Sequence, residues 1–377
     1  MRKKILLVSN TSWSLYNFRL RLMEVLRAKG FEVSFCAPYD RYAEILKKRG
    51  FRYFKIKNLE RKGLNPVREI KLIWEFYRVY KKIKPDLVLH FTIKPNIWGT
   101  IVTKLVNVKC FNTITGLGSL FVKKTFFQEA IKFLYKLSFK FSKKIFFQNK
   151  NDLEFFLKNK IVKKEETILV PGSGVDIEHF HPDFCKRIKK DSKNFIFLFA
   201  GRLLKEKGLE DLVEATKIVK NKYPNIEVWL LGKIDKDNPS TISEKELKEW
   251  ENLNLVKYLG FYDDIRSFLC KTDCFVFPSY YREGIPTCLL EAGAMEKPII
   301  TTNSVGCKEV VEEEKNGFLV APKDPEKLAK AMIKMIEIPE EKREKMGKLA
   351  RQKILKEFDQ NLVINLYLQE ILKEFKF

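Results

Sequence analysis

The chain has 377 residues, of which 45% are hydrophobic, so it is long enough for two domains that each have a core. Its net charge of +24 lies entirely in residues 1–150, which hold 33 Lys and Arg against 9 Asp and Glu. Nothing approaches 18 consecutive apolar residues, which excludes a membrane-spanning helix. Charge gathered in one part of a chain predicts a polyanionic partner there, either nucleic acid or an anionic membrane surface.

The first part of the chain alternates short apolar runs with helical patterns. The start, Met1–Lys4 followed by Ile5–Val8, is expected to be a buried strand rather than a signal peptide, because its apolar run is too short. Strands are expected over 5–8, 33–36, 53–56, 87–90, 110–114 and 144–147, and helices over 18–29, 42–49 and 67–83. This alternation predicts a parallel sheet with helices on both faces.

A helical pattern over residues 123–144 carries two stripes. An apolar stripe is expected to face the core, and it consists of Phe127, Ile131, Leu134, Leu137 and Phe141. A cationic stripe is expected to face outward, and it consists of Lys132, Lys136, Lys140 and Lys143. A solvated helix face accounts for this pattern. Because Glu129 is the only acid between 101 and 150, we expect these lysines to meet an anionic membrane as well.

The second part of the chain repeats the alternation. Strands are expected over 195–200, 227–231, 256–259, 274–277 and 298–301, and helices near 208–222, 264–270, 287–295 and 325–337. The Pro-Gly-Ser-Gly stretch at 171–174 breaks regular structure, so we place one domain at 1–168, rejoined by 361–377, and the other at 169–360. The predicted fold class is α/β, with two doubly wound Rossmann-like domains whose ligand-binding strand ends face a central cleft.

Seven cysteines, at 36, 110, 185, 270, 274, 288 and 307, show no paired metal-ligand spacing. Free thiols in a reducing cytosol are the simplest account of them.

The loop Gly201–Gly208 follows a predicted strand and opens a helix. Its cations Arg202 and Lys207 are suited to neutralising a diphosphate, because Arg offers a planar fork of donors and Lys a compact charge. In a basic protein such loop cations are more often simply solvated. Their place directly after the first strand of the second domain favours the diphosphate interpretation.

Two acids, Glu283 and Glu291, stand eight positions apart across a turn built from Gly284 and Pro286. Thr287 is the expected N-cap of the following helix, whose first amides could bind phosphate. Ionised carboxylates only accept hydrogen bonds, so they suit hydroxyl groups. The pattern points to a nucleotide sugar, although this spacing of two acids also occurs by chance in surface turns.

The motifs Pro278-Ser279, Glu283-Gly284, Pro286 and Leu290-Glu291-Ala292 resemble the signature of the family-4 retaining glycosyltransferases, which have the GT-B fold. The resemblance implies that Glu283, Arg202 and Lys207 are catalytic, with Glu283 at the donor sugar and the two cations at its diphosphate. It implies that the departing diphosphate assists deprotonation of the acceptor. The residues implied in donor binding are Glu291, at the ribose, and Gly260, Phe261, Gly284, Ile285, Pro286 and Thr287.

The first domain resembles one branch of this family, which transfers N-acetylgalactosamine onto a bacillosamine linked to undecaprenyl diphosphate in bacterial protein N-glycosylation. The matching segments are 16–19, 64–66, 94–96, 116–121 and 134–141. The residues implied in acceptor binding are Tyr16, Asn17, Arg19, Lys94, Thr115, Gly116 and Gly118. The implied partners are UDP-N-acetylgalactosamine as a substrate, a polyprenyl-diphosphate-linked acceptor and the cytoplasmic face of the inner membrane, without cofactor, metal or nucleic acid.

The chain departs from the family pattern in three places, one of which is the first loop, Ser9 to Ser14, where the paired glycines of many relatives are lacking. Thr115 stands where many relatives have His, and Glu296 stands where a helix-terminating Gly is usual. The pair Asp235 and Asp237 could hold a metal, but we expect a polar loop there. Three alternatives stay open: another family-4 transferase of O-antigen or capsule assembly, a nucleotide-sugar epimerase, and a basic nucleic-acid-binding protein. The last leaves both donor motifs unexplained.

Overall fold

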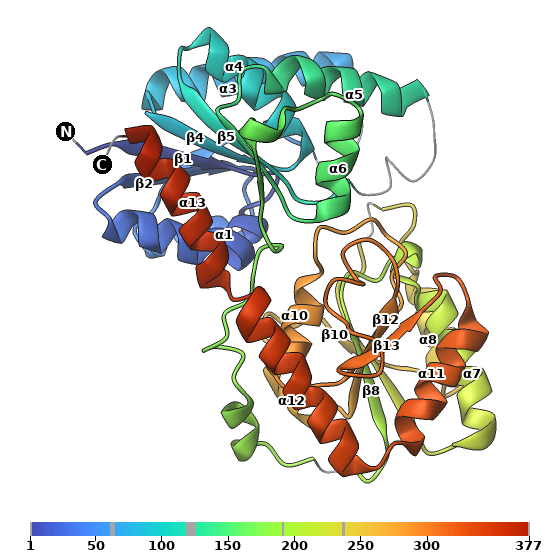
Figure 1. Ribbon diagram of the computed structural model, residues 1–377. Coiled ribbons are helices and arrows are strands. Elements are labelled where there is room, and N and C mark those ends of the chain that lie inside the picture. The colour runs from blue at the N-terminus through green and yellow to red at the C-terminus, as the bar shows by residue number, and fades with distance from the viewer. Residues whose placement is uncertain (1, 61–64, 118–125, 191, 236–237, 376–377) are drawn as a thin grey trace. The chain divides into compact units, whose positions relative to one another are not determined.

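The computed structural model describes residues 2–60, 65–117, 126–190, 192–235 and 238–375, without the side chains of 126 and 127 (Figure 1). Gly118 and Asp237 therefore lie outside the described residues. The chain forms two compact units, unit 1 of residues 1–173 with 363–377 and unit 2 of residues 174–362. The chain passes from unit 1 to unit 2 after residue 173 and returns after residue 362, a few residues later than the boundaries expected at 168 and 360. Among the described helices, none has the length and apolarity needed to cross a bilayer.

Unit 1 is built on a seven-stranded parallel sheet with strand order β3-β2-β1-β4-β5-β6-β7. The strands are β1 (Lys4–Val8), β2 (Glu32–Ala37), β3 (Arg52–Lys55), β4 (Leu87–Phe91), β5 (Lys109–Ile114), β6 (Lys144–Phe147) and β7 (Thr167–Leu169). The six strands predicted in this part are confirmed. The seventh, β7, was not predicted, because three residues at a sheet edge leave almost no periodic signal.

Helices cover both faces of this sheet. One face packs α1 (Ser12–Ala28), α2 (Arg41–Lys48) and α13 (Gln360–Phe375). The other packs α3 (Pro66–Ile83), α4 (Thr100–Leu105), α5 (Phe126–Phe139) and α6 (Lys150–Lys158), with a short π-helix, η1 (Pro95–Gly99), leading into α4. Successive residues of β1 serve opposite faces, since Ile5 and Leu7 join the first cluster and Leu6 and Val8 the second. The doubly wound α/β prediction is confirmed for this unit.

The C-terminal helix α13 belongs to the core of unit 1. The ring of Tyr367 stacks on Phe146 with centroids 4.1 Å apart, and its hydroxyl lies 2.7 Å from that of Thr113. Val363 and Ile371 of the same helix are buried beside them. The last residues of the chain therefore complete a core that its first residues begin.

The predicted stripes of α5 are wrong in part. Its buried stripe is Ile131, Tyr135 and Phe139, where the two rings pack 5.0 Å apart, whereas Leu137 and Phe141 are 40% and 36% exposed. The large rings of residues 135 and 139 take the core-facing positions, which turns the predicted apolar side partly toward solvent. The helix ends at Phe139, so Lys140 and Lys143 follow it in the chain rather than continuing its stripe.

Unit 2 holds a six-stranded parallel sheet with strand order β10-β9-β8-β11-β12-β13. The strands are β8 (Ile196–Ala200), β9 (Glu227–Leu231), β10 (Lys257–Gly260), β11 (Cys274–Phe277), β12 (Ile299–Thr302) and β13 (Gly317–Val320). The helices are α7 (Leu209–Lys222), α8 (Glu244–Asn252), α9 (Arg266–Lys271), α10 (Thr287–Ala294), α11 (Pro325–Glu337) and α12 (Glu340–Glu357). The predicted strands and helices are confirmed, while β13, α8 and α12 were not predicted.

Glu296, at the unusual position for a helix end, adopts the left-handed conformation that glycine normally supplies, with φ of +56°. The amide of the next residue, Lys297, donates to the carbonyl of Ala292 at 3.0 Å, which closes the end of α10. The departure from the family pattern is thus absorbed by backbone strain at one residue.

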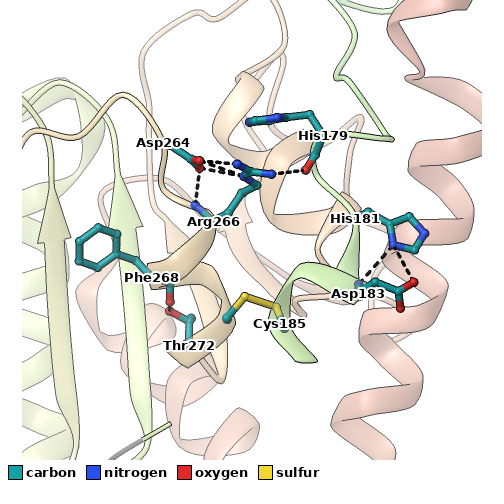
Figure 2. The surroundings of a disulfide bond; sticks show 9 residues. His179, His181, Asp183, Cys185, Asp264, Arg266, Phe268 and Thr272 are labelled. Carbon is teal, nitrogen blue, oxygen red and sulfur yellow. Dashed lines mark hydrogen bonds and ion pairs between the residues drawn. A yellow bond between two sulfur atoms is a disulfide. The ribbon is translucent and has the colours of Figure 1, made fainter. Parts of the chain in front are cut away.

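The expectation of seven free thiols is wrong, because Cys185 and Cys270 form a disulfide (Figure 2). Cys185 lies on a 3-10 helix, η4 (Pro182–Arg187), which packs on α9 and brings the two Cα atoms to 5.1 Å. The two cysteines are 85 residues apart and belong to unrelated motifs, so spacing alone could not pair them. The other five thiols are free, and four of them are buried.

Candidate active site

The candidate donor site lies at the carboxyl ends of β8 and β11, two neighbouring strands of unit 2. The chain leaves β8 toward β9 on one side and leaves β11 toward β12 on the other, so the strand order reverses between them. Parallel α/β sheets bind ligands at such a reversal, outside the carboxyl ends of the strands. The two motifs singled out in the sequence, 201–208 and 278–291, are the loops that leave these two strands.

The two loops are joined by hydrogen bonds to one carbonyl group. The carbonyl oxygen of Glu206 accepts from the amides of Tyr280 and Tyr281 at 3.0 and 3.1 Å, and from the hydroxyl of Ser279 at 3.3 Å. Gly208, with φ of +75°, faces Pro278 so closely that a Cβ would lie 2.2 Å from its carbonyl oxygen. Only glycine fits at position 208, and these contacts hold the two loops together beside the candidate site.

Lys207 and Glu283, predicted to act together, are joined in a largely buried ion pair between Nζ and Oε1. Nζ also lies 5.2 Å from the ring centre of Phe277 and 5.1 Å from that of Tyr281, within the range of cation–π attraction. Ser279 donates to the same Glu283 oxygen at 3.4 Å. The lysine is therefore held by a carboxylate and two rings at the point where a diphosphate is expected.

Arg202 lies on the other side of the same loop and is only partly covered. Its guanidinium forms an ion pair with Asp235 at 3.5 Å, so Asp235 serves as its counter-ion. In the portion of the chain that the structure describes, no three His, Cys, Asp or Glu side chains gather into a metal-binding cluster. Sequence reasoning noticed Asp235 only as a possible metal ligand and missed its contact with Arg202.

The end of α10 that faces the site begins differently from the prediction. Its N-cap is Pro286, which offers no side-chain acceptor, and Thr287 is the first helical residue, so Thr287 as N-cap is wrong. The first amides of the helix thus have no capping side chain, which is the arrangement that binds phosphate at helix starts. Gly284 and Ile285 are buried at this turn, and Gly306, with φ of +88°, approaches them so closely that a Cβ would lie 2.6 Å from the Gly284 carbonyl oxygen.

Glu291 lies one turn into α10, and burial raises its pKa to about 7 with help from the negative charge of Asp264. Asp264 is itself fixed by Arg266, which donates from Nε to Oδ1 at 3.0 Å and from NH2 to Oδ2 at 2.6 Å (Figure 2). The same guanidinium donates to the carbonyl of His179 at 3.0 Å. The disulfide-linked segment and the environment of Glu291 are therefore connected through one arginine.

The turn at Gly260 and Phe261, which the resemblance implies in donor binding, lies at the end of β10, and β9 separates β10 from β8. Gly260 has φ of +86°, and its carbonyl accepts from the amide of Gly232 at 2.8 Å. Phe261 next to it is exposed. The predicted donor residues of unit 2 thus occupy three loops along one edge of its sheet.

The predicted acceptor residues of unit 1 come from two places. Lys94, Thr115 and Gly116 follow the carboxyl ends of β4 and β5, and β4 borders β1 where the strand order reverses. Tyr16, Asn17 and Arg19 lie inside α1, which starts at Ser12 rather than at Phe18 because Thr11 caps it by accepting from the Ser14 amide at 3.1 Å. A ligand site at the reversal would draw on the loops that follow β1 and β4, which lead to the start of α1 and to Lys94.

The two cations among the predicted acceptor residues, Lys94 and Arg19, already have close neighbours. Lys94 forms a largely buried ion pair with Glu69 at 2.5 Å, and Trp98 donates to the second oxygen of Glu69 at 2.6 Å. Arg19 is only 4% exposed, lies 4.6 Å from the ring centre of Phe91, and burial lowers its pKa. Its contact with an acceptor stays a prediction. Nothing in the sequence pointed to Glu69.

Each unit matches a family model. Residues 182–353 match "Glycosyl transferases group 1", and residues 4–149 match "Glycosyl transferase 4-like". The N,N'-diacetylbacillosaminyl-diphospho-undecaprenol alpha-1,3-N-acetylgalactosaminyltransferase of Campylobacter jejuni is 29% identical, over 96% of both chains. The UDP-Gal:alpha-D-GlcNAc-diphosphoundecaprenol alpha-1,3-galactosyltransferase of Escherichia coli is 26% identical, over 79% of this chain and 78% of that one.

Among solved structures, a glycosyltransferase from Rickettsia africae superposes with a TM-score of 0.79 at 20% identity, covering 100% of this chain and 99% of that one. Anabaena HepE, in complex with UDP and glucose, superposes with a TM-score of 0.77 at 18% identity, covering 99% and 100%. At these identities the likeness extends to the fold. It agrees with the two parallel-sheet units described above.

Proposed function

The chain belongs to the family-4 glycosyltransferases of GT-B fold, and on that premise we propose that it moves a sugar from a UDP-sugar to a saccharide linked to polyprenyl diphosphate, with retained anomeric configuration. The proposed donor is UDP-N-acetylgalactosamine and the proposed linkage is alpha. Support for these substrates comes from the Campylobacter jejuni and Escherichia coli relatives, whose names specify diphospho-undecaprenol acceptors.

The observation that carries the proposal is the contact of Lys207 with Glu283, with Arg202 on the same loop. Both cations are balanced by carboxylates, since Arg202 pairs with Asp235. A donor diphosphate competes with these carboxylates for the cations, and its arrival frees Glu283 to accept hydrogen bonds from the sugar. Binding of the correct anion thus prepares the acid that contacts the sugar.

The proposed reaction breaks the bond between the sugar C1 and the diphosphate oxygen and forms a bond between C1 and the acceptor hydroxyl oxygen. The hydroxyl proton passes to the departing UDP, which stays on the face that the acceptor attacks. Arg202 and Lys207 stabilise the negative charge that develops on this leaving group, as preorganised donors do in many transferases and hydrolases. No cofactor takes part, and the two cations supply the charge that a metal ion would otherwise supply.

We place the acceptor at the carboxyl ends of β4 and β5 in unit 1. Lys94 meets the acceptor diphosphate there after exchanging its partner Glu69. We propose further that unit 1 rests on the cytoplasmic face of the inner membrane, with the exposed residues Lys136, Lys140 and Lys143 toward anionic lipid. Lys132 contributes less than these three because it is half-buried and paired with Glu129 at 2.8 Å.

The test is transfer by the purified protein. It is incubated with UDP-N-acetylgalactosamine, UDP-galactose, UDP-glucose or UDP-N-acetylglucosamine, and with diphosphate-linked acceptors on short and long polyprenyl chains. We expect one donor to be preferred and the Glu283→Gln variant to be inactive. Absence of transfer from every UDP-sugar would contradict the proposal. Activity that vanishes with EDTA and returns with manganese would point back to Asp235 as a metal ligand.

A further inference from the structure

Helix α3 carries an apolar surface on the side that faces away from the sheet. Val67, Ile70 and Trp74 are 61%, 67% and 60% exposed, and we call them the α3 stripe. Their spacing of three and four residues places them on one side of the helix. The opposite side holds the buried residues Leu72, Phe76 and Tyr80. The α3 stripe is therefore not a by-product of a poorly packed helix, since the core-facing side is complete.

Cations continue the same side of α3. Lys71, Arg78 and Lys81 are exposed and stand four, eleven and fourteen residues after Val67, which returns each of them to the same helix face. A helix with Trp and large aliphatic residues beside Lys and Arg is typical of segments that lie in the boundary between lipid headgroups and acyl chains. The ring of Trp74 stacks on Tyr77 at 5.5 Å, so two amphipathic rings stand together.

The α3 stripe lies near the ligand-binding edge of unit 1. Helix α3 begins after the carboxyl end of β3, and Glu69, one residue before Ile70, holds both Lys94 and Trp98 just beyond the carboxyl end of β4. The first turns of α3 are thus tied by a buried ion pair to the loop in which the acceptor site is placed. Whatever covers the stripe comes close to that site.

The same layer of helices exposes a second apolar surface. Helix α4 contacts both α3 and α5, and all three lie on one face of the sheet (Figure 1). Phe133, Leu137 and Phe141 are exposed on and just after α5, and Lys104 of α4 lies 5.9 Å from the ring centre of Phe141. On the opposite face of the sheet, the described helices expose large apolar side chains only singly, Trp13 at the start of α1 and Leu362 at the start of α13.

We propose that the α3 stripe inserts into the headgroup region of an anionic bilayer, with the exposed face of α5 as a second contact. An anionic lipid surface is the occupant because the exposed apolar residues alternate with cations on both helices, whereas a buried protein interface is depleted of Lys. Insertion seats the acceptor edge of unit 1 at the surface that presents lipid-linked saccharides. Only this last consequence rests on the proposed transferase activity.

The test measures partition of the full chain onto vesicles of phosphatidylglycerol and phosphatidylcholine, by sedimentation at low and high salt. We expect the variant Val67→Ser, Ile70→Ser, Trp74→Ser to bind about tenfold more weakly or worse at both salt concentrations, because burial of apolar surface is not screened. The matched control is Ile218→Ser, Leu253→Ser in unit 2, where both residues are exposed, and it should bind like wild type.

A second measurement reports insertion directly. Brominated lipids quench a tryptophan only when its ring enters the bilayer, so the quenching should largely disappear in Trp74→Phe while that variant keeps its affinity. Vesicle binding of the triple variant equal to wild type would overturn the inference. So would a dimer in the absence of lipid that the triple variant abolishes, since the stripe would then cover a second copy of the chain.

The transferase activity is tested independently of vesicle binding. The triple variant should transfer sugar normally to a short-chain acceptor in solution. If the wild-type protein shows no transferase activity, the proposed function fails, but the vesicle measurements still test the membrane contact of the α3 stripe.

Discussion

The two units have the same architecture, but their surfaces differ in charge and in exposed apolar residues. The excess charge of the whole chain falls within residues 1–150 of unit 1, and exposed apolar residues gather there on α3 and α5. In unit 2 the site cations Arg202 and Lys207 are each paired with an acid, and exposed apolar residues such as Leu253 are scattered. The shared fold determines where ligands bind, at the carboxyl ends of the strands. The outer faces of the helices are not constrained in this way, so their charge and apolar character can differ between the two units.

The largest expected effect comes from the charge pairs of unit 2. Replacing Arg202 or Lys207 with Ala, or Glu283 with Gln, should lower kcat by roughly 10²-fold or more, the scale for removing a preorganised charge. The matched control is Lys205→Ala, on the same loop, because Lys205 is only partly covered and pairs with Glu210 at 2.9 Å. Initial rates decide this, with thermal unfolding to verify the fold. Full activity of any of the three would remove that residue from the site.

The next effect tests the charge of unit 1. Changing Lys136, Lys140 and Lys143 together to Glu should release the protein from anionic vesicles, because each cation near such a surface contributes about 1 kcal/mol. Lys132→Glu alone should do less than Lys136→Glu, since Lys132 is half-buried beside Glu129. Transfer to a long-chain acceptor should slow more than transfer to a short-chain one.

The control for this experiment lies in unit 2, where Lys245 and Lys248 of α8 are exposed. Their replacement with Glu should leave vesicle binding unchanged. Equal losses from both units would mean that net charge acts as a whole and that the comparison between the units is mistaken.

A smaller effect concerns pH and Glu291, whose pKa is raised to about 7. Below this value the carboxyl takes up a proton and accepts ribose hydroxyls less well, so kcat/KM for the donor should fall by up to about tenfold per pH unit. Glu291→Gln should flatten this profile. A pH profile between 5 and 8 that is the same in both proteins would place Glu291 outside the donor site.

Stability should change in the opposite sense. A carboxyl whose folded pKa exceeds its ordinary value of 4.5 favours the folded state when protonated, so its contribution is lost as the pH rises toward 7. Glu291→Gln should therefore be more stable than wild type at pH 8 and similar to it at pH 4, as measured by denaturant unfolding.

The smallest effect on transfer is expected from the disulfide. Cys185→Ser should leave initial rates close to wild type, because the bond lies outside the loops that carry Lys207 and Glu283. It should lower the free energy of unfolding of unit 2 by about 2–4 kcal/mol under oxidising conditions, since the bond closes a long loop. Under reducing conditions the two proteins should unfold alike. A large loss of activity would show that the link from Arg266 to Asp264 depends on the disulfide.

Apolar runs and the polar residues between them predicted the sheets well, because buried parallel strands such as Cys274–Phe277 are short continuous apolar runs bounded by polar residues. They failed for α5, where Tyr135 and Phe139 rather than Leu137 and Phe141 pack inward. A stripe of equal apolar character on two sides of a helix leaves its rotation open until the neighbours are known.

The motifs assigned Lys207 and Glu283 to one donor site, and their side chains lie in contact because each follows a central strand of one sheet. The counter-ions of the site could not be predicted in the same way. Glu69 and Asp235 stand 25 and 33 residues from their partners Lys94 and Arg202 in the sequence, so these pairs form only when the chain is folded. Pairings across the fold leave no trace in local sequence.

Helix α13 bears on the order in which the chain acquires its structure during synthesis. Residues 174–362 contain all of unit 2. When these residues have left the ribosome, the core of unit 1 still lacks Tyr367 and its neighbours in α13. Until then Phe146 has no stacking partner from α13 and the hydroxyl of Thr113 lacks that of Tyr367. Unit 1 is translated first but completed last, and premature termination just after residue 362 would spare unit 2 while leaving the core of unit 1 incomplete.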